Sequence, residues 1–324
     1  MNEYLIQQVI NALSAGSLYA LMAVGLALIF GILRLINFAH GDVMMVAAYI
    51  AVFSLAAGMP LPVGIATMLV GTIVVGLLIE RVAYRPLRGA PEVALLLTSF
   101  AVGQILQSGV LLLTRLSGKP IQIAFPAPEV LSGVVDVGAF TISKVNLGSF
   151  IVGVVVLVLL TIFVSRTRLG LSMHAAAEDL DAARLMGIRI NLVVASAFAI
   201  AAALAAIAGL FYAAQTGQIN PFMGFTPVLK AFIAAVIGGF GSLAGAVLGA
   251  YVLAFLEVLP TALFGIADII PAGSIPPELH DVLAAALPAH LSGYRDAFVF
   301  IVLIVILLFR PSGLLGGRAR EETP

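Results

Sequence analysis

The feature that most constrains this chain is the recurrence of long apolar runs. Runs of roughly 18 apolar residues or more occur along its whole length, and each is long enough to cross about 30 Å of hydrocarbon. Hydrophobic residues make up 62% of the 324 positions and charged residues only 10%, against about 25% charged in an average soluble domain. A water-soluble fold could not bury that much apolar surface. The sequence therefore predicts an all-α, polytopic membrane protein.

Small residues and the absence of cysteine narrow this prediction. The 32 glycines fit transmembrane helices, because small residues let such helices approach closely. The first apolar run, residues 5–33, has no basic segment before it and is too long for a signal peptide, so we interpret it as a retained first span. The chain has no cysteine, which excludes disulfides, thiolate metal sites and cysteine nucleophiles.

Apolar windows between helix-breaking residues predict about 8 to 9 transmembrane helices, with broken or re-entrant segments among them. The second, seventh and eighth spans are short or broken. Together the spans are expected to form a single membrane domain over residues 1–317, followed by a cytoplasmic tail at 318–324. The expected spans are residues 5–33, 42–57, 61–79, 93–114, 148–165, 192–215, 226–239, 243–259 and 296–309.

Basic residues concentrate in alternate loops, which predicts the orientation. If all nine crossings exist, eleven of the 16 Lys and Arg residues fall on one side, and that side is expected to be cytoplasmic. The N-terminus is then outside and the C-terminus inside. The eleven residues are Arg34, Arg81, Arg85, Arg88, Arg166, Arg168, Arg184, Arg189, Arg310, Arg318 and Arg320.

Two long loops are expected on the outer face. The first, about 115–147, contains "VVDVGAFTISKV", whose alternation predicts a small hairpin. The second, about 260–293, contains "PPELHDVLAAALPAHL", whose apolar positions share one helical face and predict an amphipathic helix in the membrane interface. The alternative for both is an ordinary connecting loop without function.

The most informative polar segment is "RTRLGLSMHAAAEDLDAARLMGIRI", residues 166–190. Its middle has strong helix formers, acidic residues precede Arg184, and Gly187 follows where a C-terminal cap belongs. The pattern predicts a short cytoplasmic helix at about 174–188, joined to a span at each end. Such a helix is either a docking element or a solvated loop helix.

This segment resembles the coupling-helix motif of bacterial ABC importer permeases of the branched-chain amino-acid type, the LivH/LivM family. Five further stretches are similar to that family in order and spacing, and they cover most of the chain. Their combination is closer to the LivH-type subunit than to the LivM-type subunit. The stretches are "INFAHGD" (36–42), "ERVAYRPLRG" (80–89), "GQINPFMGF" (217–225), "KAFIAAVIGGFGSLAGA" (230–246) and "RPSGLLG" (310–316).

The resemblance implies a function and partners. It implies a transmembrane subunit of an ATP-binding-cassette importer in the bacterial inner membrane, moving a small solute from periplasm to cytoplasm. The expected partners are a second, LivM-like permease, two cytoplasmic ATP-binding subunits and a periplasmic substrate-binding protein, with no nucleic acid. In the motif, the residues implied to contact the ATPase are Ala177, Glu178, Asp179, Ala182 and Gly187.

The residues agree that ATP is hydrolysed by another chain. There is no G-x-x-x-x-G-K-[ST] phosphate loop, and the only Gly-Lys, at 118–119, precedes Pro120. We therefore expect no enzymatic activity, no catalytic residue, no metal site and no bound cofactor in this chain. ATP and Mg²⁺ would be used by the partner subunits.

The cargo is less constrained than the mechanism. Branched-chain or related amino acids are expected first, but relatives that carry urea or aromatic acids leave those cargoes open. Residues 271–280 look inserted relative to the family, so the outer loop at 260–293 is longer than expected.

The stretch "RLINFAHGDVMM" (34–45) places Asn37, His40 and Asp42 between two apolar segments. It is either a loop, an acid–base pair, or a polar break in the transport path. We favour a structural bend at the cytoplasmic mouth of the pathway, because backbone polar groups inside a membrane need partners that Asn37 and Asp42 can supply.

Other polar residues are candidates for the pathway. Lys230 could hold the carboxylate of an amino acid, or its side chain could extend to the membrane interface, and Glu257 has the same two interpretations. Asn220, beside a proline in a broken stretch, lines the pathway only if that stretch enters the membrane.

Basic residues at 81, 85 and 88 suit anionic lipid head groups. A contact between them and the ATPase is the alternative.

Two functions of other classes compete with the importer. One is an intramembrane enzyme that uses His40 and Asp42, together with His174. Against it, such sites need several ligands or a facing nucleophile and base, and the four histidines are scattered. The other is a self-sufficient channel or carrier.

Overall fold

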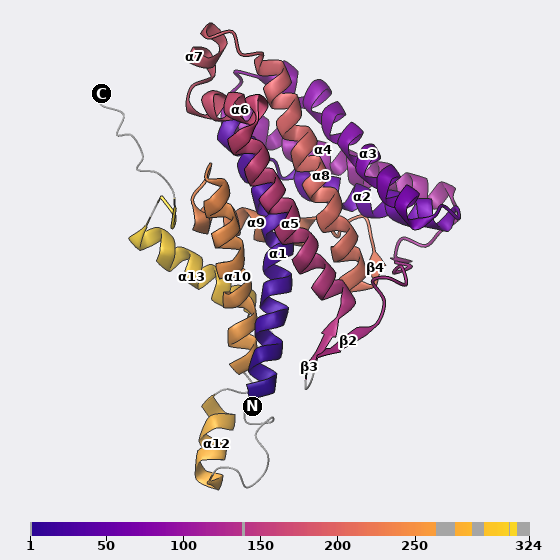
Figure 1. Cartoon of the computed structure of the whole chain (residues 1–324), viewed down its shortest axis with the longest axis vertical. Coiled ribbons are helices and arrows are strands. Elements are labelled where there is room, and N and C mark those ends of the chain that lie inside the picture. Colours follow the sequence, from indigo (N-terminus) through magenta and orange to yellow (C-terminus); the bar gives the residue numbers. More distant parts are fainter. Residues whose placement is uncertain (1, 138–139, 264–275, 287–294, 311, 316–324) are drawn as a thin grey trace.

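The computed structural model describes residues 2–137, 140–263, 276–286, 295–310 and 312–315, and it is mainly helical (Figure 1). The helices are α1 (Asn2–Leu33), α2 (Ala39–Ala56), α3 (Leu61–Ile79), η1 (Glu80–Tyr84, a π-helix), η2 (Arg85–Leu87, a 3₁₀ helix), α4 (Glu92–Leu116), α5 (Lys144–Arg166), α6 (Arg168–Glu178), α7 (Leu180–Leu185), α8 (Ile190–Thr216), α9 (Phe225–Gly238), α10 (Leu243–Leu263), α12 (Pro277–Ala286) and α13 (Arg295–Phe309). The short strands are β1 (Ile123–Ala124), β2 (Val134–Val137), β3 (Phe140–Ser143) and β4 (Gln218–Ile219).

The helices confirm an all-α polytopic membrane fold. Within the described residues, six helices are long and apolar enough to cross a membrane, and the bent pair α9 and α10 raises this to seven if it forms one span. A shorter apolar helix, 299–309, lies within α13. These elements correspond to the predicted spans, including the short and broken ones.

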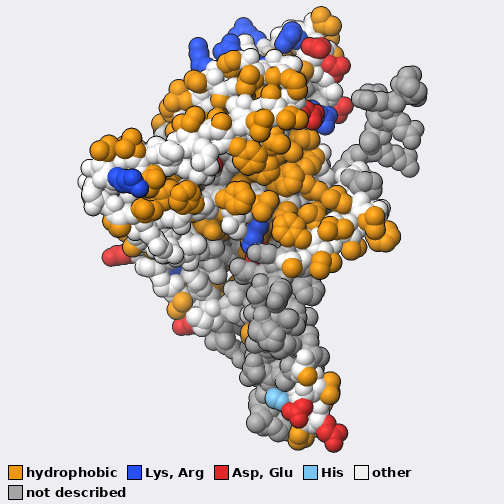
Figure 2. Space-filling view, turned by 180° about the vertical axis from the view of Figure 1, so that it is seen from behind, with side chains coloured by type: hydrophobic (Ala, Val, Ile, Leu, Met, Phe, Trp, Pro, Cys, Tyr) orange, Lys and Arg blue, Asp and Glu red, His pale blue; other side chains and the backbone are white. Residues whose placement is uncertain are grey.

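Helix α1 is the centre of the bundle. It packs against α10, α8, α9 and α5, and 78% of its most apolar window is buried, as is the same share of α2. For α3, α4 and α5 the buried share is only 28%. These three outer helices expose large apolar side chains such as Val70 and Leu112, and Figure 2 shows wide hydrophobic areas on one face. A surface of this kind requires lipid or protein around it.

Helix α2 begins after a non-helical break in the chain that follows α1. The chain is not helical over residues 34–37, and α2 then packs on α3, α8 and α4. Near its start, the backbones of Gly41 and Gly224 touch: a Cβ on either residue would lie 2.2 Å from the carbonyl oxygen of the other. Only glycine permits this approach, which joins the first turn of α2 to the N-terminal cap of α9.

A sharp bend separates α9 from α10. The two helices differ in direction by 116°, and Gly239 and Gly241 in the connection have φ angles of 103° and 86°, which other residues rarely adopt. The segment after α13 packs on this bend: the amides of Leu314 and Leu315 donate to the carbonyls of Ile237 and Gly238. Those carbonyls close α9, so the C-terminal segment supplies partners that a helix end lacks.

The extramembrane elements lie at two ends of the molecule (Figure 1). Strands β2 and β3 form the antiparallel hairpin predicted in the first outer loop, and the helix predicted in the second outer loop is α12. Both lie at the end opposite to α6 and α7 (Figure 1). The rest of that second loop, 264–275 and 287–294, and the predicted tail at 318–324 lie outside the described residues.

Candidate functional site

The segment between α5 and α8 forms two helices, where the sequence predicted one at about 174–188. Helix α6 starts earlier, at Arg168, because the Thr167 hydroxyl accepts from the amide of Gly170 (3.0 Å). The prediction of one continuous helix was wrong because Asp179 ends α6 and begins α7. Its Oδ1 accepts from the amides of Asp181 and Ala182, both at 2.9 Å, and aspartate is a preferred N-cap residue.

The residues expected to contact an ATPase are mostly on the surface of this segment. Glu178, Asp179, Ala182 and Gly187 are exposed, whereas Ala177 is half-buried. Gly187 follows α7 with a φ of 83°, as predicted for a C-terminal cap.

Two apolar side chains beside them belong to the motif, but we did not predict them as contact residues. Leu185 is 89% exposed and Met186 is 83% exposed. Large apolar side chains this exposed at the end of the molecule are typical of a contact surface.

Two cavities lie beneath the α6–α7 segment. One, of about 370 Å³, lies between α7 and the region of η1, with Asp181 and Arg184 on one side and Tyr84 and Arg88 on the other. The second, of about 490 Å³, is lined by residues of α1, α5, α6 and α10, including His174 and Glu178. The segment therefore rests on the spans with open space beside it.

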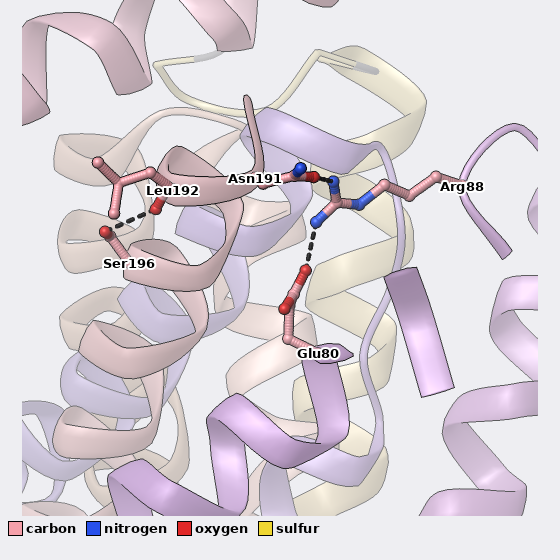
Figure 3. Close-up of polar contacts among 5 residues, drawn as sticks. All are labelled: Glu80, Arg88, Asn191, Leu192 and Ser196. Atoms are coloured by element: carbon pink, nitrogen blue, oxygen red, sulfur yellow. Dashed lines mark hydrogen bonds and ion pairs between the residues drawn. The ribbon is translucent and has the colours of Figure 1, made fainter. Parts of the chain in front are cut away.

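A polar cluster joins the start of α8 to the end of α3 (Figure 3). The Arg88 guanidinium forms an ion pair with Glu80 of η1 and donates to Oδ1 of Asn191 in α8 (2.5 Å). We predicted Arg88 as a lipid or ATPase contact, but its side chain turns inward and only 22% of it is exposed. Arg81 and Arg85 are exposed. The local signal for the pair was Glu80, eight positions earlier.

The same helical turn reaches the polar break before α2. The Tyr84 hydroxyl donates to Oδ1 of Asn37 (2.9 Å), and both residues are buried. A continuous path of contacts therefore runs from Asn191 through Arg88 and η1 to Asn37.

His40 and Asp42 are both buried, but they face different helices. The Asp42 carboxylate accepts from Gln107 of α4 (2.8 Å), and the His40 ring packs against Gly25 of α1. The His40 Nε2 has no hydrogen-bond partner within the described part of the chain. The geometry thus separates the two groups that an acid–base pair would need together.

Asn220 and Lys230 have partners of different kinds. The Asn220 side chain accepts from the amide of Phe222 (2.9 Å) and so caps a turn before α9. Lys230 forms an ion pair with Glu257 of α10 at 2.5 Å. Among the residues that the structure describes, no group of three or more His, Asp or Glu residues is placed to hold a metal ion.

Comparisons with known proteins give a consistent result. The family described as "branched-chain amino acid transport system / permease component" matches residues 8–307. The chain is 37% identical over 320 residues to the high-affinity branched-chain amino acid transport system permease protein BraD of Pseudomonas aeruginosa, covering 96% of this chain and 95% of BraD. It is 34% identical over 322 residues to the corresponding protein LivH of Escherichia coli, covering 97% and 96%.

A more distant relative is named for a different import system. The autoinducer 2 import system permease protein LsrC of Salmonella paratyphi B is 27% identical over 268 residues, covering 79% of this chain and 72% of LsrC. No solved structure gives a significant match. The relatives are transport permeases rather than enzymes. The buried α1 and the outer helices with exposed apolar side chains are those of a multi-pass membrane protein. Because these matches extend over nearly its whole length, the chain belongs to the branched-chain amino acid transport permease family.

Proposed function

We propose that the chain is one permease subunit of an ATP-binding-cassette importer in the bacterial inner membrane. It moves branched-chain or related amino acids from the periplasm to the cytoplasm, with its N-terminus outside and its C-terminus inside. Its partners are a second, LivM-like permease, two ATP-binding subunits that use ATP and Mg²⁺, and a periplasmic substrate-binding protein.

The α6–α7 segment is the observation that supports this proposal best. It joins two long apolar helices, α5 and α8, and exposes both acidic groups and the apolar side chains of Leu185 and Met186. A partner that moves this segment also moves the start of α8. The contacts of Arg88 and Tyr84 then carry this movement to the non-helical stretch before α2. Rigid-body motion of packed helices is a common route for such coupling.

The cargo assignment rests on the names of BraD and LivH, and the direction rests on the basic residues. Arg166 is the last residue of α5, directly before α6, and Arg184 lies in α7. Arg81 and Arg85 lie in η1 and η2, and Arg88, which follows η2, lines the same cavity as Arg184. Basic loops favour the cytoplasmic side. The site proposed for the ATPases is therefore on the side where ATP is present.

The test is purification and reconstitution with the partner proteins. The chain should co-purify with a second permease and two ATP-binding subunits, and the complex in liposomes should take up amino acids when loaded binding protein is added outside. The variant Glu178→Lys with Asp179→Lys should insert normally but lose transport. Normal ATPase stimulation by loaded binding protein in that variant would show that the segment is not the contact, and activity of the chain alone would favour a channel or carrier.

A further inference from the structure

An ion pair joins the two helices on either side of the sharp bend. Lys230 of α9 and Glu257 of α10 contact each other at 2.5 Å (Nζ to Oε1), although they are 27 positions apart. Tyr19 of α1 contacts both: its hydroxyl donates to Oε2 of Glu257 (2.8 Å) and accepts from Lys230 (3.2 Å). These three side chains, here called the charged triad, join three helices.

The triad is costly where it lies. Tyr19 is near the middle of α1, and α9 and α10 are the two parts of the bent candidate span. Only 15% of the Lys230 side chain and 7% of the Glu257 side chain are exposed. Removing two charges from water costs several kcal/mol each and is a poor way to stabilise a fold. Ionisable residues inside a membrane therefore generally indicate a pathway or a ligand site.

Apolar side chains lie on the same helix beside the triad. Lys230 lies on the outward side of α9, which also carries Thr226 and four apolar residues: Phe225, Leu229, Phe232 and Val236. The Phe232 ring lies 5.5 Å from both Phe38 and Phe240, centroid to centroid. A paired charge next to an aromatic and aliphatic surface matches a ligand that has two opposite charges at one end and an apolar group at the other.

We propose that the charged triad is a binding site for the charged ends of a zwitterionic α-amino acid during transport. Lys230 and the Tyr19 hydroxyl donate to the α-carboxylate of the ligand, and Glu257 accepts from its α-ammonium group. The aliphatic side chain then lies along the outward side of α9. This inference rests on the proposed function and selects α-amino acids over urea and over acids that lack an ammonium group.

Charge balance supports this class of ligand. The pair and the zwitterion each have a net charge of zero, so each end of the ligand meets a group of opposite charge. A ligand with only a carboxylate or only an ammonium group matches one charge of the pair and not the other, and unmatched charges cost most where the dielectric constant is low.

The experiment compares leucine moved per ATP hydrolysed by the reconstituted complex in liposomes, with leucine presented by its binding protein. The main variant is Lys230→Met with Glu257→Gln, which removes both charges of this pair together, because removing one of them alone is strongly destabilising. The matched control is Tyr251→Phe, which removes an uncharged hydrogen bond between two of the same helices, from α10 to the Ser17 hydroxyl of α1 (2.9 Å). Assembly of the complex is measured for each variant.

We expect the main variant to assemble and to retain ATP hydrolysis stimulated by the binding protein. Leucine moved per ATP should fall between about 10-fold and 100-fold, the range for losing hydrogen bonds to charged groups. In the control, any fall in transport should be matched by a fall in ATP hydrolysis, so that their ratio is kept. An unchanged ratio in the main variant would overturn the site and assign the pair a structural role.

A second variant decides the outcome if the first does not assemble. Tyr19→Phe keeps both charges and the ring, and leucine per ATP should fall about 5-fold, as for one lost hydrogen bond. An unchanged ratio in this variant would also overturn the site. Failure of the parent complex to move any amino acid would instead contradict the proposed function. A parent complex that moves leucine, with both variants equal to it, would contradict the site alone.

Discussion

Two buried ion pairs, Glu80 with Arg88 and Lys230 with Glu257, place the same kinds of charge in different surroundings. Their exposures are similar: 4% and 22% for the first pair, 7% and 15% for the second. The first closes a turn of the chain beside the start of α8, whereas the second joins α9 and α10 across a sharp bend. One pair lies near the α6–α7 end of the molecule, and the other lies among spans.

The choice of cation differs in a way that fits the two positions. The Arg88 guanidinium is planar and permanently charged, and it contacts Glu80 and Asn191 at once, as a rigid fork of donors can. The Lys230 ammonium is a point charge on a flexible stem, with donors that rotate. Arginine suits a fixed connection and lysine suits a contact that is exchanged. This contrast supports our two proposals, that the pair near α6 and α7 transmits movement and that the pair between spans binds a ligand.

The largest expected effect is that of removing one charge from the pair between spans. Lys230→Met alone leaves Glu257 without its ion pair, and the cost should be about 3–5 kcal/mol of unfolding free energy. Lys230→Met with Glu257→Gln should recover most of this loss. Thermal unfolding of the complex in detergent measures both. If the single and double variants were equally stable, the two charges would not stabilise each other and the contrast with Glu80 and Arg88 would disappear.

A conservative change at the other pair should have a smaller effect. Arg88→Lys keeps the charge but cannot serve Glu80 and Asn191 together, so about 1.5–3 kcal/mol should be lost, the value of a hydrogen bond to a charged group. The same unfolding measurement applies, with Arg81→Lys as the control because Arg81 is exposed. Wild-type stability and transport of Arg88→Lys would mean that the fork geometry is not used.

The smallest expected effect concerns the hydrogen bond from Tyr84 to Asn37, which connects η1 to the non-helical stretch before α2. Tyr84→Phe removes the donor to Asn37 and should cost about 1–2 kcal/mol, because a buried acceptor then lacks its partner. Tyr49→Phe, which removes a longer hydrogen bond to the Ile121 carbonyl (3.3 Å), is the control. If Tyr84→Phe were as stable as the parent and still coupled ATP hydrolysis to transport normally, the hydrogen bond to Asn37 would not connect the Glu80 and Arg88 region to the non-helical stretch before α2.

Much of the fold could be predicted because membrane spans follow from local composition. The run at 5–33 corresponds to α1, and the short span at 226–239 corresponds to α9, since apolar length sets where a helix crosses. The hairpin β2–β3 was also predicted, from alternation. These are properties of neighbouring residues, which a single sequence contains.

The contacts between distant residues could not be predicted in the same way. Lys230 and Glu257 were each considered alone, because their pairing depends on the 116° bend between their helices. The division of α6 from α7 depends on whether Asp179 accepts from its own following amides or stays on the helix surface. An aspartate allows both, and the surrounding packing decides.

The contact between Gly41 and Gly224 has an electrostatic consequence. It brings the first turn of α2 and the N-terminal cap of α9 together inside the bundle. A helix N-terminus carries a partial positive charge of roughly half an elementary charge, so two such ends meet near one point. Asp42 is the acidic residue in the first turn of α2, where a negative charge is favourable. The first-turn position and the hydrogen bond from Gln107 of α4 together account for an acidic side chain in this apolar span.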